Sequence, residues 1–72
     1  MEIGKKIREL RMRKGLTQEE LANRSELSKG FISQLENDVT SPSIATLVDV
    51  LTCLGTDLKT FFGEEQDNQI VF

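Results

Sequence analysis

Four residues of the segment 28–37 form a pattern suited to contacting DNA bases. On a helix they share one polar face, opposite the apolar positions of the same segment; they are Lys29, Gly30, Ser33 and Gln34. Gln34 can bond bidentately to adenine, Lys29 can donate to guanine O6 and N7, and Ser33 can bond to either partner. Gly30 would let the helix backbone approach DNA closely. The alternative is a polar face that is simply solvated, with Lys29 an ordinary surface lysine.

Catalytic and metal-binding chemistry has little support in the sequence. The chain has no His, and Cys53 is its only Cys, so it offers no imidazole base, no internal disulfide and no Cys-cluster zinc site. It also has no nucleophile elbow and no phosphate-cradling glycine-rich loop. We therefore expect a chain that is not an enzyme and has no metal or cofactor, with Cys53 as a small packing residue.

Length and charge bound the answer further. Seventy-two residues allow one core, and 9 basic against 12 acidic groups give a net charge of −3. The basic groups gather in the N-terminal half: residues 1–37 hold 8 of them and 6 acidic groups, whereas residues 38–72 hold 1 and 6. This distribution favours a DNA-facing N-terminal half. The chain begins with no apolar signal segment and has no membrane-length apolar run, which predicts a cytoplasmic protein.

Apolar residues recur at helical spacing through most of the chain, which predicts an all-α domain of five short helices. The expected helices span about residues 2–14, 17–24, 28–37, 43–54 and 57–63. Thr17 and Glu20 have the spacing of a capping box, and Ser28 and Ser43 are expected N-caps. The glycines at 15 and 55 are expected to end helices. The fourth helix is expected to bury Ile44, Leu47, Val48, Leu51 and Leu54.

The segment 18–37 has the organisation of a helix-turn-helix, because two short helices are separated by a turn of about four residues. Leu21 and Ala22 on its first helix would meet apolar residues of the second, Ile32 and Leu35. Leu27 would fill the corner. This packing would leave the polar face of the second helix free to enter a major groove.

This stretch resembles the XRE-type, phage-repressor-like helix-turn-helix family. The specific markers are Leu-Thr-Gln-Glu-Glu-Leu-Ala at 16–22 and Ile-Ser-Gln-Leu-Glu at 32–36, and the resemblance covers about residues 3–62. It implies a compact five-helix, lambda-repressor-like fold. It also implies a transcription regulator, most simply a repressor, that binds a double-stranded DNA operator as a homodimer on an inverted repeat.

The resemblance also implies roles for individual residues. Lys29, Gly30, Ser33 and Gln34 match base-facing positions, Gln18 and Asn37 match phosphate contacts, and Arg11 with Glu36 matches an ion pair that ties the first helix to the third. The helix N-termini capped by Thr17 and Ser28 would point amides toward phosphates. Arg13 has two open interpretations, a phosphate contact or a solvated cation.

Two departures from the family bear on affinity. Glu26 stands where the turn usually has a left-handed Gly, at a cost of about 1 kcal/mol. The loop at 38–41 contains no Lys or Arg, so phosphate contacts there would depend on amides and hydroxyls. Together with the negative net charge, this loop motivates an alternative function: a protein-interaction module, such as an antitoxin-like or anti-repressor partner, that uses the same fold.

The C-terminal segment divides the chain. We expect a DNA-binding domain at 1–63 and an acidic linker or tail at 64–72 that ends in a short strand-like run. Phe61 and Phe62 followed by this segment are similar to the junction that precedes a cupin-type sensor in some regulators. A small-molecule effector would act only through such an additional domain.

Overall fold

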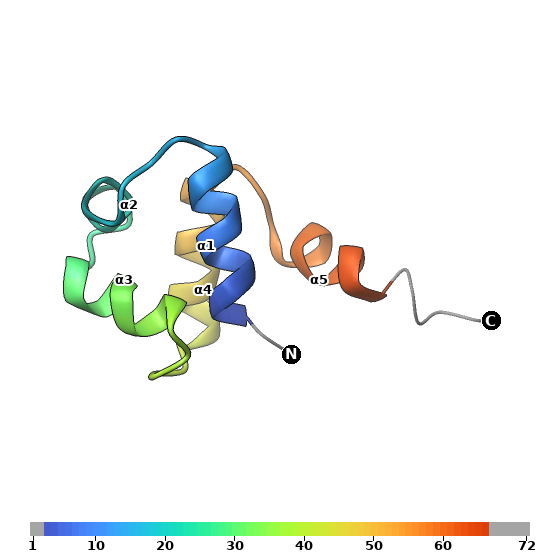
Figure 1. Cartoon of the computed structure of the whole chain (residues 1–72). Coiled ribbons are helices and arrows are strands. Elements are labelled where there is room, and N and C mark those ends of the chain that lie inside the picture. The colour runs from blue at the N-terminus through green and yellow to red at the C-terminus, as the bar shows by residue number, and fades with distance from the viewer. Residues whose placement is uncertain (1–2, 67–72) are drawn as a thin grey trace.

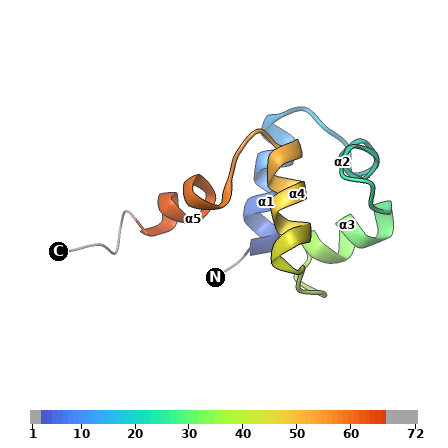
Figure 2. The same ribbon diagram turned by 180° about the vertical axis from the view of Figure 1, so that it is seen from behind.

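The computed structural model of the chain describes residues 3–66, with side chains described as far as residue 63, and it contains five helices in that range. They are α1 (Ile3–Arg13), α2 (Gln18–Arg24), α3 (Lys29–Glu36), α4 (Ile44–Cys53) and α5 (Leu58–Gln66). Figure 1 shows α2 and α3 on one side of α1 and α4, and α5 on the other side. The reverse view in Figure 2 shows α4 in front of α1. The expected all-α class is confirmed. None of the helices described is long and apolar enough to cross a membrane.

The starts of four helices are fixed by side-chain caps, and the three caps named in the sequence, at residues 17, 28 and 43, are confirmed. Thr17 Oγ1 accepts the Glu20 amide at 3.0 Å, and Glu20 Oε1 accepts the Thr17 amide at 2.8 Å, which completes the capping box of α2. Ser28, Ser43 and Asp57 cap α3, α4 and α5 in the same i to i+3 geometry. Each cap satisfies an amide that precedes the first intrahelical bond.

The ends of the first four helices share one backbone motif. A residue with positive φ follows each helix, and two reverse hydrogen bonds close the last turn. The four residues are Gly15 (φ 70°), Glu26 (φ 59°), Asp38 (φ 58°) and Gly55 (φ 78°). The glycines at 15 and 55 were predicted to end helices, and Glu26 was predicted to occupy a left-handed position. Asp38 was not, because its sequence context contains no glycine signal.

The core is formed by apolar side chains from all five helices: Ile7, Leu21, Ala22, Ile32, Leu35, Leu47, Val50, Leu51, Leu54 and Phe61. The prediction for α4 was partly wrong. Ile44 and Val48 are 67% and 40% exposed, whereas Val50 is fully buried. The buried positions of α4 and its C-cap residue Leu54 are spaced i, i+3, i+4 and i+7 from Leu47, and Val48 lies about 100° around the helix from Leu47. Ile44, the first residue of α4, lies beyond the edge of the core.

Helix α5 extends further than the sequence predicted. It continues to Gln66 instead of ending at Gly63, so it crosses the expected boundary between domain and linker. Gly63 has no left-handed φ, and Glu64, Glu65 and Gln66 are good helix formers. The remainder of the expected linker and its strand-like end, residues 67–72, lie outside the described residues.

Candidate nucleic-acid interface

Helices α2 and α3 form the expected helix-turn-helix. Ala22 of α2 is buried in the core together with the other core residues of the two helices. Leu27, in the turn, is partly buried and packs against this core. Ser25 is also buried, and its hydroxyl donates to the Leu21 carbonyl at 2.7 Å. The same carbonyl also accepts the Ser25 backbone N–H at 3.0 Å, so the hydroxyl adds a second bond at the end of α2 and satisfies its own buried polar group. The turn is therefore packed and hydrogen-bonded.

The four expected base-facing residues lie on the accessible side of α3. Lys29, Gly30 and Gln34 are exposed and Ser33 is half-buried, whereas Ile32 and Leu35 on the opposite side are buried. A Cβ added at Gly30 would meet only the Ser28 hydroxyl, at 4.0 Å. The backbone at Gly30 thus faces open space, as a close approach to a ligand would require.

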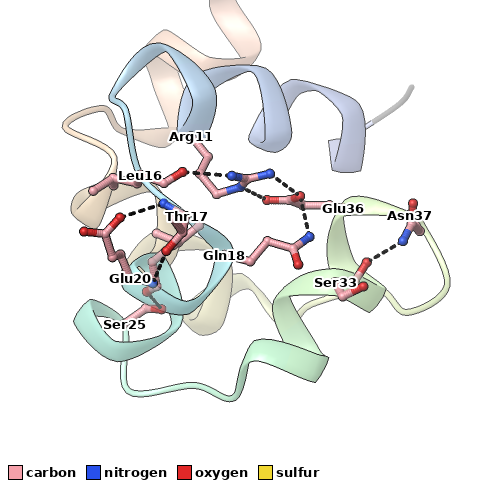
Figure 3. A network of polar contacts seen from close by, with 10 residues as sticks. Arg11, Leu16, Thr17, Gln18, Glu20, Ser25, Ser33, Glu36 and Asn37 are labelled. Carbon is pink, nitrogen blue, oxygen red and sulfur yellow. Dashed lines mark hydrogen bonds and ion pairs between the residues drawn. The ribbon is translucent and has the colours of Figure 1, made fainter.

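A buried ion pair ties α3 to α1. Arg11 Nε and Nη2 donate to the two Glu36 carboxylate oxygens at 2.6 and 3.1 Å, and Nη1 donates to the Leu16 carbonyl at 2.8 Å. The Arg11 and Glu36 side chains are 12% and 2% exposed. Figure 3 shows this fork between α1 and α3. The pair expected from the family resemblance is present, and its two-pronged geometry fixes orientation as well as distance.

Gln18 joins the same network. Its Nε2 donates to Glu36 Oε1 at 3.0 Å, so α1, α2 and α3 meet at one carboxylate (Figure 3). This bond points the amide nitrogen of Gln18 at Glu36, because a carboxylate can only accept. The Gln18 oxygen and the second N–H remain available. The predicted phosphate contact would therefore come from a side chain whose orientation is already set.

The other predicted phosphate contacts are Thr17, Ser28, Asn37 and Arg13, and the first three have intramolecular hydrogen bonds at the ends of α2 and α3. Thr17 and Ser28 use their hydroxyls as caps, so phosphate contacts at these helix ends would come from first-turn amides. Asn37 donates to the Ser33 carbonyl at 2.9 Å. Arg13 does not join the others: it is exposed and lines a small recess with Thr56 and Phe61, on the side of α5.

Two acidic residues, Glu19 and Glu20, lie in the first turn of α2. The Thr17 backbone N–H, and then its hydroxyl, hold the pKa of the exposed Glu20 carboxyl below its ordinary value. Glu20 is therefore ionised at neutral pH. It interacts favourably with the N-terminal dipole of α2, which a bound phosphate would also use.

Asp38 and Gly4 were missed by sequence reasoning. Asp38 Oδ1 accepts the Gly4 amide at 3.0 Å, which joins the residue after α3 to the first turn of α1. The one available signal was an acidic residue directly after the Asn37 end of an expected helix, at a position that often needs a left-handed residue. The partner, 34 residues away, could not be deduced.

Comparisons with known proteins agree with this geometry. A family model described as helix-turn-helix matches residues 7–61. The chain is 35% identical over 65 residues to an immunity repressor protein of Bacillus phage phi105, which covers 90% of this chain and 45% of that protein. It is 40% identical over 63 residues to the transcriptional regulator PuuR of Escherichia coli K12, covering 88% of this chain and 34% of PuuR. The chain thus spans less than half the length of either relative.

The fold is shared with a solved regulator. The clp gene regulator ClgR of Corynebacterium glutamicum superimposes with a TM-score of 0.83 at 32% identity, covering 92% of this chain and 70% of that one. The family match spans both helices of the α2–α3 unit and the ion pair that holds them. The expected resemblance is confirmed, and the chain belongs to the XRE-type helix-turn-helix family.

Proposed function

We propose that the chain binds double-stranded DNA sequence-specifically as the DNA-binding part of a transcription regulator, most simply a repressor. The observation that carries this proposal is the exposed polar face of α3, held by the buried Arg11–Glu36–Gln18 network. The matched relatives support it, since they are a phage repressor and a transcriptional regulator. The proposed function is DNA binding and not catalysis. We propose that the chain acts in the cytoplasm, where it would meet the DNA.

In the proposed complex α3 lies in the major groove. Gln34 and Lys29 read base edges, Ser33 adds a shorter contact, and Gly30 allows close approach. The amide of Gln18 and the first-turn amides of α2 and α3 bind the phosphates that flank the groove. One recognition helix reads only a few base pairs, so we propose a homodimer on an inverted repeat with half-sites roughly 34 Å apart.

The test is selection of duplexes from a random library by the chain at low salt, followed by affinity measurements on the enriched sequence. Replacing Gln34 by Ala should cost about 1–3 kcal/mol at one base position and relax the preference there. Gln18→Ala should weaken binding to all duplexes alike. Lys59→Ala, on the exposed side of α5, is the matched control for Lys29→Ala and should leave binding unchanged. No enrichment, or enrichment that survives Gln34→Ala with Lys29→Ala, contradicts the proposal.

A protein-interaction function is the second candidate, and one surface favours it. Val39 and Ile44 are 71% and 67% exposed, which leaves apolar area uncovered near the exit of α3. Salt dependence separates the two functions. DNA binding that neutralises phosphates weakens steeply as salt rises, whereas the binding of a protein partner through an apolar surface would change little.

A further inference from the structure

The exit of α3 is attached to the start of α1 by a single carboxylate. Asp38 Oδ1 accepts the Gly4 N–H at 3.0 Å. That amide lies in the first turn of α1, where N–H groups have no intrahelical partner, and a negative charge is favourable at a helix N-terminus. The bond therefore satisfies a need of α1 with a side chain that belongs to the segment leaving α3.

The backbones of the two helices touch at the same place. A Cβ added at Gly4 would lie 2.4 Å from the Leu35 carbonyl oxygen and 2.6 Å from that of Glu36. These distances are too short for any side chain, and Gly4 is buried. The first turn of α1 thus abuts the last carbonyls of α3, and the Asp38 bond closes this contact from outside.

Helix α3 is consequently anchored to α1 at two points. Glu36 binds Arg11, and Asp38 binds Gly4, seven residues and about 10 Å earlier along α1. The ion pair fixes how the two charged groups meet, but rotatable bonds separate each group from its own helix, so the pair alone leaves α3 some freedom of direction. A second anchor at this separation fixes the direction of α3 and hence the aim of its polar face.

The backbone of Asp38 has a left-handed conformation, with φ at 58°, which glycine adopts most easily and which Asp and Asn tolerate better than other residues. Glu26 has the same conformation, φ 59°, at the matching place after α2. The Glu26 side chain is exposed and has no hydrogen-bond or ion-pair partner among the side chains and backbone that the structure describes. Asp38 differs from Glu26 by its bond to Gly4, so the two residues form a natural pair of test and control.

We propose that Asp38 is a positioning residue of the DNA interface: its carboxylate fixes the direction of α3 by binding the first turn of α1. This inference rests on the proposed function, because the direction of α3 matters only if its face reads bases. The readout is the specificity ratio. We define it as the Kd for a mixed-sequence duplex divided by the Kd for the duplex that the wild-type chain enriches from a random library.

Asp38→Gly relieves the backbone and removes the bond, so the variant should fold while its specificity ratio falls by about tenfold, the discrimination of one good base contact. Asp38→Asn keeps an accepting oxygen and tolerates positive φ, so its ratio should stay within about twofold of wild type. Glu26→Gly should also stay within about twofold, because it relieves the same backbone conformation without removing a bond. An Asp38→Gly chain that keeps the wild-type ratio overturns the inference. Equal losses in the Asn and Gly variants overturn it as well.

Amide hydrogen exchange at Gly4 tests the bond without DNA. Gly4 should be protected in the wild-type and Asp38→Asn chains, and exchange about tenfold faster in Asp38→Gly. Equal exchange in all three chains contradicts the inference. A wild-type chain that enriches no duplex contradicts the proposed function, and the Gly4 exchange then still decides whether the attachment exists.

Discussion

Helices α1 to α3 are joined by directed polar bonds, whereas α4 and α5 are joined to the rest mainly by apolar burial. Arg11, Gln18 and Glu36 link the first three helices at one buried carboxylate, and Asp38 adds the link to Gly4. Helix α4 contributes Leu47, Val50 and Leu51 to the core, its C-cap residue Leu54 adds a fourth side chain, and α5 contributes Phe61. Among the described residues, the polar links of this second part are modest: Lys6 donates to the Phe61 carbonyl and lies over its ring, and the Cys53 thiol donates to the Arg24 carbonyl at 3.3 Å.

Apolar burial and directed polar bonds have different effects on the helices that they hold. Apolar burial is non-directional and grows with the area removed from water, so it stabilises the fold without setting the rotation of a helix closely. A two-pronged ion pair fixes angle as well as distance. The directed bonds therefore lie around α3, the helix whose direction matters for the proposed binding.

The largest effect is expected from Arg11→Met. The substitution leaves the Glu36 carboxylate buried without its partner, which should lower the free energy of unfolding by about 3–5 kcal/mol. A chain of this length has a total stability of about 4–11 kcal/mol, so the variant should be close to unfolding. Urea denaturation measures the loss.

Two companions sharpen this result. Arg8→Met, at an exposed position of the same helix, should change stability by no more than about 0.5 kcal/mol. Arg11→Met combined with Glu36→Leu should recover most of the loss, because both charges then leave the interior. A double variant as stable as wild type that has lost base discrimination would confirm that the pair acts on orientation. If this double variant still discriminates between bases, the ion pair is not what sets the direction of α3.

Leu51→Ala should have the next largest effect. It should lower the free energy of unfolding by about 2–5 kcal/mol, because burial is lost and a cavity is left behind. Val48→Ala on the exposed side of α4 is the control and should cost no more than about 0.5 kcal/mol. The comparison predicts that Leu51→Ala leaves the specificity ratio of the folded protein unchanged. A fall in that ratio, measured at a temperature where the variant is folded, would show that apolar contacts also set the aim of α3.

Local sequence signals predicted one part of this structure well. The caps at Thr17, Ser28 and Ser43 involve residues three apart, so their partners lie within the sequence window that shows them. The Arg11–Glu36 pair spans 25 residues and was expected only through the family resemblance. The four base-facing candidates are accessible as expected, but their roles stay predictions.

The misses have physical causes of two kinds. Val50 was recoverable, since a strict i, i+3, i+4, i+7 spacing from Leu47 includes it and excludes Val48. The Asp38–Gly4 bond was not, because nothing near either residue names the other. The bond of Gln18 to Glu36 belongs to the same class, since a long polar side chain can meet solvent, phosphate or a neighbour equally well. The bonds of Asp38 and Gln18 depend on how the helices pack in three dimensions, which the local sequence pattern does not show.

Glu26→Gly should produce a smaller effect of opposite sign. The substitution removes a side chain from a positive-φ position, so unfolding free energy should rise by about 1 kcal/mol. Asp38→Gly relieves the same backbone but loses the bond to Gly4, so it should gain less than Glu26→Gly. Equal gains in the two variants would mean that the Asp38 bond contributes nothing to stability. Thermal denaturation of both chains under one buffer condition makes the comparison.

The smallest expected effect is on the pH dependence of stability. Glu20 in α2 and Asp57 before α5 report on one part of the molecule each. The pKa of Glu20 in α2 and the pKa of Asp57 at the start of α5 are both lowered below their ordinary values of 4.5 and 3.8, first of all because a backbone N–H donates to each carboxylate, from Thr17 and Thr60. A lowered folded-state pKa means that each carboxylate stabilises the fold above its ordinary pKa. This contribution is lost as pH falls through the lowered folded value.

Stability should therefore decline as pH falls below about 5, and Glu20→Gln or Asp57→Asn should each flatten the decline. Both replacements keep an accepting oxygen, so the caps persist without the charge. If the chain unfolds as one cooperative unit, the two variants flatten the same global transition in urea. If Asp57→Asn instead changes only an early step that does not involve α2, then α5 unfolds separately. In that case the apolar attachment of the second part is the weaker of the two.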